Sequence, residues 1–107
     1  MLIFSCHSDT GFSSHALSRR RDGEVYGHLD NFVGVYALMR AYFSGRLNQD
    51  YLRIELTYGE EEDFAGAYEV LDTISHDDLV IVVDVTGIET EKDFTIEHMS
   101  AAFNSLF

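Results

Sequence analysis

The stretch from Leu52 to Ile74, LRIELTYGEEEDFAGAYEVLDTI, joins a predicted strand to a predicted helix. Apolar side chains occupy every second position from Leu52 to Tyr58, which is typical of a half-buried strand. From Asp63 onward, apolar residues recur at the spacing of a helix of about three turns that ends near Ile74. A strand that leads directly into a helix is the unit from which α/β folds are built.

Three adjacent carboxylates, Glu60, Glu61 and Glu62, follow Gly59 between this strand and this helix. Like charges this close raise one another's pKa unless a positive group lies among them. Acidic residues also suit a helix N-terminus, and most charge runs are simply solvated. The run therefore fits either a solvated helix start or a bound cation, and the rest of the chain must decide between them.

The flanking sequence repeats the alternation of strand and helix. Leu2–Cys6 is predicted as a short buried strand, Phe32–Phe43 as a helix that ends before Gly45, and Leu79–Val83 as a strand buried on both faces. A final helix is predicted from Ile96 to Leu106, and residues 11–28 are expected to be irregular, with a turn at Asp22-Gly23. The inward stripe of the first helix is predicted to consist of Phe32, Val35, Tyr36, Met39, Tyr42 and Phe43.

The order strand, loop, helix, strand, helix, strand, helix predicts an α/β fold with a mostly parallel sheet flanked by helices. We expect residues 1–107 to form a single domain, since the sequence contains no linker, internal repeat or low-complexity segment.

Composition excludes several kinds of partner. A net charge of −12 makes nucleic acid an unsuitable ligand, because phosphate contacts require a basic surface. The sequence contains neither a long apolar run nor the basic start of a signal peptide, so we expect no membrane partner. The single cysteine, Cys6, cannot form an internal disulfide and is expected to be buried in a cytoplasmic protein.

Acidic residues and one histidine follow the predicted strands. His7 and Asp9 come after the first strand, Glu60 and Glu61 after the second, and Asp84 after the third, while Asp30 precedes the first helix. In an open parallel sheet these positions meet at one rim, which is where ligands bind. Each has a simpler explanation on its own, such as a turn former or a helix cap. Together they fit a zinc or two-metal site.

Four segments give the sequence a resemblance to a known family. They are SCHSDTG (5–11), DGEVYGHLDNFVGVYAL (22–38), YGEEEDFAGA (58–67) and IVVDVTG (81–87). In order and spacing they resemble the co-catalytic zinc exopeptidases, the superfamily of zinc aminopeptidases, glutamate-type carboxypeptidases and related deacylases. The resemblance implies a metal-dependent hydrolase that cleaves a peptide or a related small amide with metal-activated water.

The resemblance also implies a role for each matching residue. His7 and Asp84 would bind one metal ion, Glu61 would bind a second, and Asp30 would bridge the two. Asp9 would hydrogen-bond the other ring nitrogen of His7, and Glu60 would act as the general base. The implied cofactor is zinc, as two ions, although cobalt and manganese suit the same ligands.

The sequence departs from the family pattern in three respects. The family has a further histidine ligand downstream, for which His98 is the one candidate, and it has strands ahead of the first motif. Asp63 stands where a glycine is expected. We therefore expect a truncated, central part of a catalytic domain, whose exposed sheet edges favour a homo-oligomer.

Two other interpretations remain open. The chain could be a catalytically incomplete metal-binding or assembly module of the same family, which the missing histidine favours. It could also be an acidic flavodoxin-like domain with an incidental carboxylate cluster, although His7 and the paired glutamates have no role there.

Overall fold

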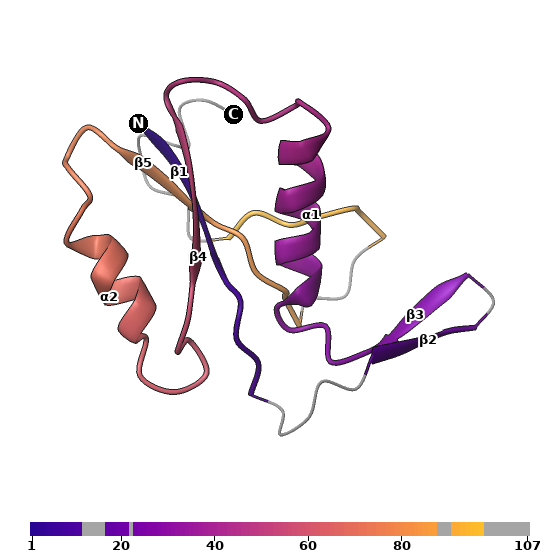
Figure 1. Cartoon of the computed structure of the whole chain (residues 1–107). Coiled ribbons are helices and arrows are strands. Elements are labelled where there is room, and N and C mark those ends of the chain that lie inside the picture. Colours follow the sequence, from indigo (N-terminus) through magenta and orange to yellow (C-terminus); the bar gives the residue numbers. More distant parts are fainter. Residues whose placement is uncertain (12–16, 22, 88–90, 98–107) are drawn as a thin grey trace.

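The computed structural model describes residues 1–11, 17–21, 23–87 and 91–97 (Figure 1). It contains five strands and two helices within that part of the chain. In chain order they are β1 (Leu2–His7), β2 (Leu17–Arg21), β3 (Glu24–Gly27), α1 (Phe32–Phe43), β4 (Leu52–Thr57), α2 (Ala65–Leu71) and β5 (Leu79–Val82). The predicted α/β fold is confirmed.

The main sheet has the order β4-β1-β5 and is parallel throughout. The central strand β1 pairs along its full length with β4, from Leu2 opposite Leu52 to His7 opposite Thr57. On its other side Leu2 is opposite Leu79 of β5. Helices α1 and α2 lie on opposite sides of this sheet (Figure 1). The carboxyl ends of the three strands therefore meet at one rim.

The fully buried apolar residues of the described part are few. Ile3 and Cys6 of β1 are 0% exposed, and Leu38 of α1 is 5% exposed. Cys6 is thus buried, as the sequence predicts. Since β1 supplies two of these three side chains, the packing of the whole unit is centred on this strand.

The prediction that β5 is buried on both faces is wrong. Val80 is 36% exposed and Val82 is 70% exposed, although both belong to an uninterrupted apolar strand. The reason is that α2 has seven residues and packs mainly along β4. An apolar groove of about 360 Å³ remains between α2 and β5, with Phe64, Leu71 and Val82 among its walls.

The predicted inward stripe of α1 is also wrong in part. Phe32, Tyr36, Tyr42 and Phe43 are 47%, 54%, 49% and 79% exposed, whereas Gly34 and Leu38 are buried. The rotation of α1 is set by its N-cap, Asn31, which is buried against the sheet. Residues three and seven positions beyond Asn31 consequently face inward.

Two further predictions need correction, and one cannot be assessed. Within residues 11–28, β2 and β3 form an antiparallel hairpin in place of the irregular segment, with Gly23 at φ +82° in its turn. Helix α2 ends at Leu71, before the predicted end at Ile74. Most of the helix predicted from Ile96 to Leu106 lies outside the described part of the chain, and Phe94–Glu97 is not helical.

The boundaries of α1 agree with the sequence. The helix runs from Phe32 to Phe43, and Gly45 follows it at φ +81°, the left-handed conformation expected of the residue after a helix. Neither helix of the described part is long and apolar enough to cross a membrane.

Candidate metal centre

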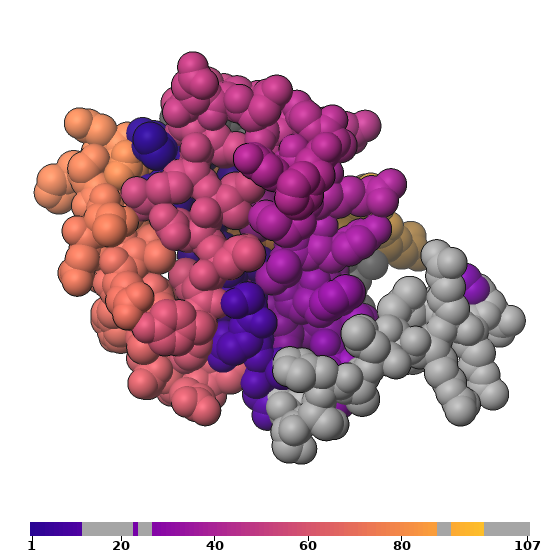
Figure 2. Space-filling view, in the orientation of Figure 1, coloured from indigo at the N-terminus to yellow at the C-terminus, as the bar shows by residue number. Residues whose placement is uncertain are grey.

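The parallel sheet brings all six predicted site residues to one rim. His7 is the last residue of β1, Asp9 follows it, and Asp84 lies two residues beyond β5. Glu60 and Glu61 lie in the loop after β4, and Asp30 lies two residues before α1. In the space-filling view, the indigo surface of the segment after β1 lies between the loop after β4 and the start of α1 (Figure 2).

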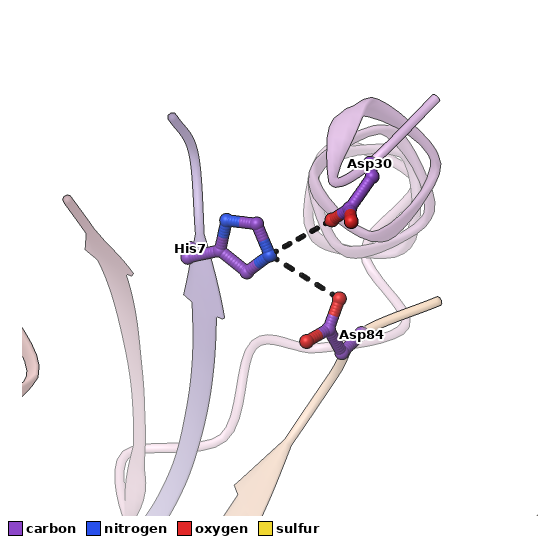
Figure 3. Close-up of side chains that lie close together, drawn as sticks. All are labelled: His7, Asp30 and Asp84. Carbon is purple, nitrogen blue, oxygen red and sulfur yellow. Dashed lines mark hydrogen bonds and ion pairs between the residues drawn. The ribbon is translucent and has the colours of Figure 1, made fainter. Parts of the chain in front are cut away.

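The imidazole of His7 is the centre of this cluster, and its residue is only 4% exposed. Its Nε2 atom lies 3.0 Å from Asp30 Oδ1 and 3.2 Å from Asp84 Oδ1 (Figure 3). The same atom lies 3.6 Å from Glu60 Oε2. Its Nδ1 atom lies 3.1 Å from the carbonyl oxygen of Asp9 and 3.3 Å from Asp9 Oδ1. Since a carbonyl oxygen can only accept, Nδ1 carries a proton and donates to Asp9.

The other ring nitrogen of His7, Nε2, lies near more carboxylate oxygens than it can donate hydrogen bonds to. Nε2 can donate one hydrogen, yet three carboxylates approach it. Asp30 Oδ1 is buried and has no hydrogen-bond partner, because its 3.0 Å contact with Nε2 lacks hydrogen-bond geometry. A buried carboxylate oxygen that accepts no hydrogen bond is costly, even with an imidazole nitrogen 3.0 Å away. This donor set therefore fits a cation shared between the imidazole and the carboxylates.

The spacing of the donor atoms fits a metal ion as well. His7, Asp30 and Asp84 form one group whose ligand atoms lie within 4.8 Å of one another, and His7, Glu60 and Glu61 form a second. Ligands about 2.1 Å from a tetrahedral zinc ion are about 3.4 Å apart, and the contacts of His7 Nε2 at 3.0 and 3.2 Å are close to that value. The residues that could hold one ion are thus His7, Asp30 and Asp84.

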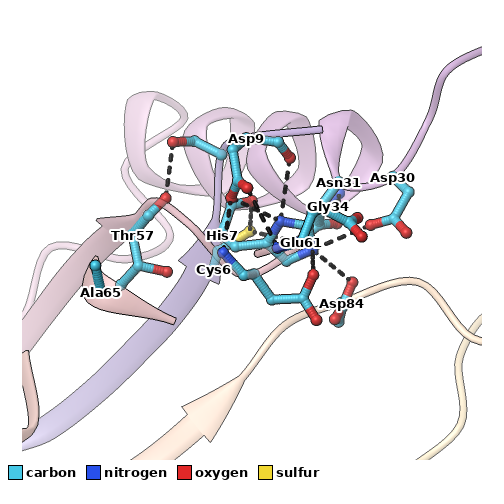
Figure 4. Close-up of polar contacts among 12 residues, drawn as sticks. Cys6, His7, Asp9, Asp30, Asn31, Gly34, Thr57, Glu61, Ala65 and Asp84 are labelled. Carbon is cyan, nitrogen blue, oxygen red and sulfur yellow. Dashed lines mark hydrogen bonds and ion pairs between the residues drawn. The ribbon is translucent and has the colours of Figure 1, made fainter. Parts of the chain in front are cut away.

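Asp9 connects the histidine to the loop after β4. Its Oδ1 and Oδ2 atoms accept hydrogen bonds of 3.3 Å from the backbone N–H groups of Glu60 and Glu61 (Figure 4). Burial alone would raise the pKa of Asp9, but these hydrogen bonds lower it below its ordinary value. Asp9 therefore stays ionised, orients the His7 ring and fixes the backbone of the two glutamates.

The loop that carries Glu60 and Glu61 is held by two glycines. Gly59 adopts φ +78°, and its carbonyl oxygen accepts from the N–H groups of residues 62, 63 and 64. Gly66 packs so closely on the end of β4 that a Cβ atom there would lie 2.4 Å from the backbone nitrogen of Tyr58. Asp63 accepts from the N–H of Ala65, so the departure from the family pattern at this position serves the start of α2.

Crowding of carboxylates changes the acidity of this loop. Partial desolvation and the charges of Asp30 and Glu60 raise the pKa of Glu61. Cys6 lies beneath the site, where burial and the charge of Asp84 raise its pKa to about 11. Cys6 is therefore a neutral thiol at neutral pH in the metal-free protein, and it belongs to neither ligand group.

Asn31 belongs to the second of the four motifs, but the sequence alone indicates no role for it. It is 2% exposed, and its side chain bonds to Cys6, Val83 and Gly34 (Figure 4). The peptide bond between Asp30 and Asn31 is cis. Asn31 is the N-cap of α1, so the alternative in which Asp30 is the cap does not hold. The available signal was the position of Asn31 three residues before a helical glycine.

Comparisons with protein-family models, curated proteins and solved structures find no match for this chain. The resemblance to zinc exopeptidases therefore stays a prediction that rests on the four motifs. His98, the candidate for the further histidine ligand, lies outside the described residues.

We predict that the pKa of His7 in the metal-free protein lies above its ordinary value of 6.5. Burial lowers this pKa, but the carboxylates of Asp84, Glu60 and Asp30 outweigh burial and raise it. His7 then stabilises the fold most below pH 6.5, and this contribution is lost as the pH rises through the raised value. An NMR titration of the imidazole measures it, and a value of 6.5 or lower would contradict the described charge balance.

Proposed function

We propose that this chain binds a divalent metal ion through His7, Asp30 and Asp84 and hydrolyses a peptide or a related small amide. The observation that supports this most directly is the environment of His7 Nε2, which faces several carboxylates at ligand-to-ligand distances. One imidazolium offers a single positive charge against the four carboxylates around the ring. A divalent cation would supply the charge that this cluster lacks.

Zinc is the ion that we propose, since one imidazole with carboxylates is a familiar zinc ligand set. Cobalt and manganese accept the same donors. Glu61 belongs to the second ligand group, and with Asp30 as the bridge it would hold a second ion. That second ion would be bound more weakly, because the described residues offer it two carboxylates and no further imidazole.

The residues of the chain divide the chemistry of hydrolysis among them. A bound metal would supply a Lewis acid that polarises the amide carbonyl and acidifies a water molecule. Glu60, whose Oε2 lies 3.6 Å from His7 Nε2, would accept the proton of that water and pass it to the leaving amine. Asp9 would hold the proton of His7 on Nδ1, so that Nε2 is unprotonated and could bind the metal.

A second candidate function is metal binding without turnover. Both ligand groups of the described residues depend on the same histidine, so a two-metal site would be incomplete without a further ligand. The chain would then be a metal-stabilised binding or assembly module. An incidental acidic cluster on a flavodoxin-like domain is the third candidate, and it predicts no specific metal affinity.

We predict that protein loaded with zinc and then desalted retains at least one zinc ion per chain. Asp30→Ala is expected to lose it, and a second ion if one is present, because Asp30 belongs to the first ligand group and would also bridge to the second ion. Elemental analysis of the metal content measures the loss. Asp77→Ala is the matched control, since Asp77 is an exposed turn residue away from the rim. Full zinc content in Asp30→Ala would refute the proposed role of Asp30.

We predict that Glu60→Gln retains the metal but lowers hydrolysis by a factor of about 10²–10⁴, the usual contribution of a general base. The measurement is the hydrolysis of a panel of chromogenic aminoacyl amides and dipeptides. Glu62→Gln is the control, because Glu62 belongs to neither ligand group. If the wild-type protein binds zinc and cleaves none of these substrates, the function without turnover is supported instead.

We also propose that two copies of the chain associate through β5. The outer edge strand β4 carries the ion pair between Arg53 and Glu55, with Nε and Oε1 3.0 Å apart, and charged edges resist pairing. The opposite edge strand, β5, has the uncharged sequence LVIV, and its Val80 and Val82 extend the apolar groove beside α2. Antiparallel pairing of two β5 strands would join two three-stranded sheets into one.

We predict a dimer in solution that strengthens with salt, because each copy has a net charge of −12 and screening reduces the repulsion. Val82→Lys is expected to yield monomers, since it places a charge beside the pairing edge. Light scattering coupled to size exclusion measures the mass. Phe43→Lys is the control, because Phe43 is equally apolar and 79% exposed but lies at the far end of α1. A monomeric wild type at every salt concentration would rule out this assembly.

A further inference from the structure

Asn31 is adjacent in sequence to one residue of the first ligand group, and its side chain bonds to the residues that precede the other two. Its Nδ2 atom donates to the carbonyl oxygen of Val83 at 2.9 Å and to Cys6 Sγ at 3.1 Å. Val83 precedes Asp84, Cys6 precedes His7, and Asn31 itself follows Asp30. One buried amide therefore lies one residue away from each proposed ligand.

We infer that Asn31 is a positioning residue that sets the separation of His7, Asp30 and Asp84 and thereby the metal affinity of the site. This inference rests on the proposed metal-binding function. In this role the side chain of Asn31 contacts neither the side chains of the proposed ligands nor the metal ion. It acts on the backbone from behind the ligands.

Both N–H groups of the Asn31 amide and its oxygen are hydrogen-bonded at this position. The two N–H groups of Nδ2 serve Val83 and Cys6, and Oδ1 accepts from the backbone N–H of Gly34 at 3.1 Å. The residue is 2% exposed, so water does not compete for these bonds. Three directional bonds fix the plane of the amide and, with it, the relative positions of β1, α1 and the end of β5.

Asp84 depends on this arrangement more than His7 does. His7 is paired within the sheet, whereas Asp84 lies beyond the last residue of β5. The N–H of Val83 donates to Ser5 O at 2.8 Å, and the carbonyl of Val83 accepts from Asn31. The peptide group that enters Asp84 is thus held by the Asn31 amide, and without it the sheet would fix only the preceding peptide group.

Gly34 provides an independent way to move Asn31. A Cβ atom on Gly34 would lie 2.4 Å from Asn31 Oδ1 and 2.9 Å from its Cγ, distances that no side chain tolerates. Gly34→Ala would therefore displace the amide without changing its chemistry. The same substitution favours the helix itself, because alanine is the better helix former.

The experiment compares metal affinity in four folded proteins by competition with a chromogenic zinc chelator, with circular dichroism as the check on folding. Asn31→Ser keeps a hydroxyl that can cap α1 but is too short to reach Val83 and Cys6. We expect Asn31→Ser and Gly34→Ala each to bind zinc about 10–100-fold more weakly than the wild type, the usual effect of losing a residue that orients metal ligands. Leu38→Ala is the control, since Leu38 is buried on α1 but belongs to neither ligand group.

The absorption spectrum of the cobalt-loaded proteins provides a second readout. We expect Asn31→Ser and Gly34→Ala at saturating cobalt to show an altered visible spectrum, because the ligand geometry changes, and Leu38→Ala to match the wild type. Wild-type affinity and spectrum in both variants would overturn the inference and leave the proposed metal site intact. An equal loss of affinity in Leu38→Ala would also overturn it, because general destabilisation would then explain the effect. Failure of the wild type itself to bind zinc or cobalt would overturn the proposed function and this inference together.

Discussion

The parallel pairing of β1 with β4 and β5 is the constraint on which the site depends. It places three strand ends at one rim, and at least one carboxylate follows each of them within a few residues. Charge is therefore concentrated by topology, and His7 at the end of the central strand lies among four carboxylates. Repulsion within such a cluster opposes the fold unless a cation offsets it.

This constraint links metal binding to stability. The described part of the chain buries only Ile3, Cys6 and Leu38 as core apolar residues, and small cores leave little stability in reserve. A cation that binds only the folded chain adds its binding free energy to folding. The rim is thus the part of the folded chain that a bound ion would stabilise.

Local sequence patterns predicted where most strands and the first helix lie. Contacts between distant segments determine which side chains are buried, and the sequence does not show these contacts. Alternation and helical spacing located β1, β4, β5 and α1, because these signals lie within a few neighbouring residues. The exposure of Val82 depends on how far α2 extends across the sheet, and the inward face of α1 depends on a buried contact between Asn31 and Cys6. Right-handed crossovers and short connections narrow the possible orders of the three strands but do not select one. The hairpin of β2 and β3 was not predicted, because the run of arginines in β2 lacks the alternation of apolar and polar residues that indicates a strand.

Asp30 and Asn31 illustrate why sequence patterns pick out the carboxylates of the rim but not the residue that supports them. Asp30 is recognisable because a carboxylate at a rim position has an obvious chemical use. Asn31 is adjacent in sequence, but its side chain enters the fold and has meaning only through partners 25 and 52 residues away. Its neutrality matters as much as its hydrogen bonds. An aspartate there would add a buried charge beside the four carboxylates and could not donate to Val83, whereas a lysine would pair with these carboxylates. An amide is the side chain that joins these three segments without entering the charge balance of the rim.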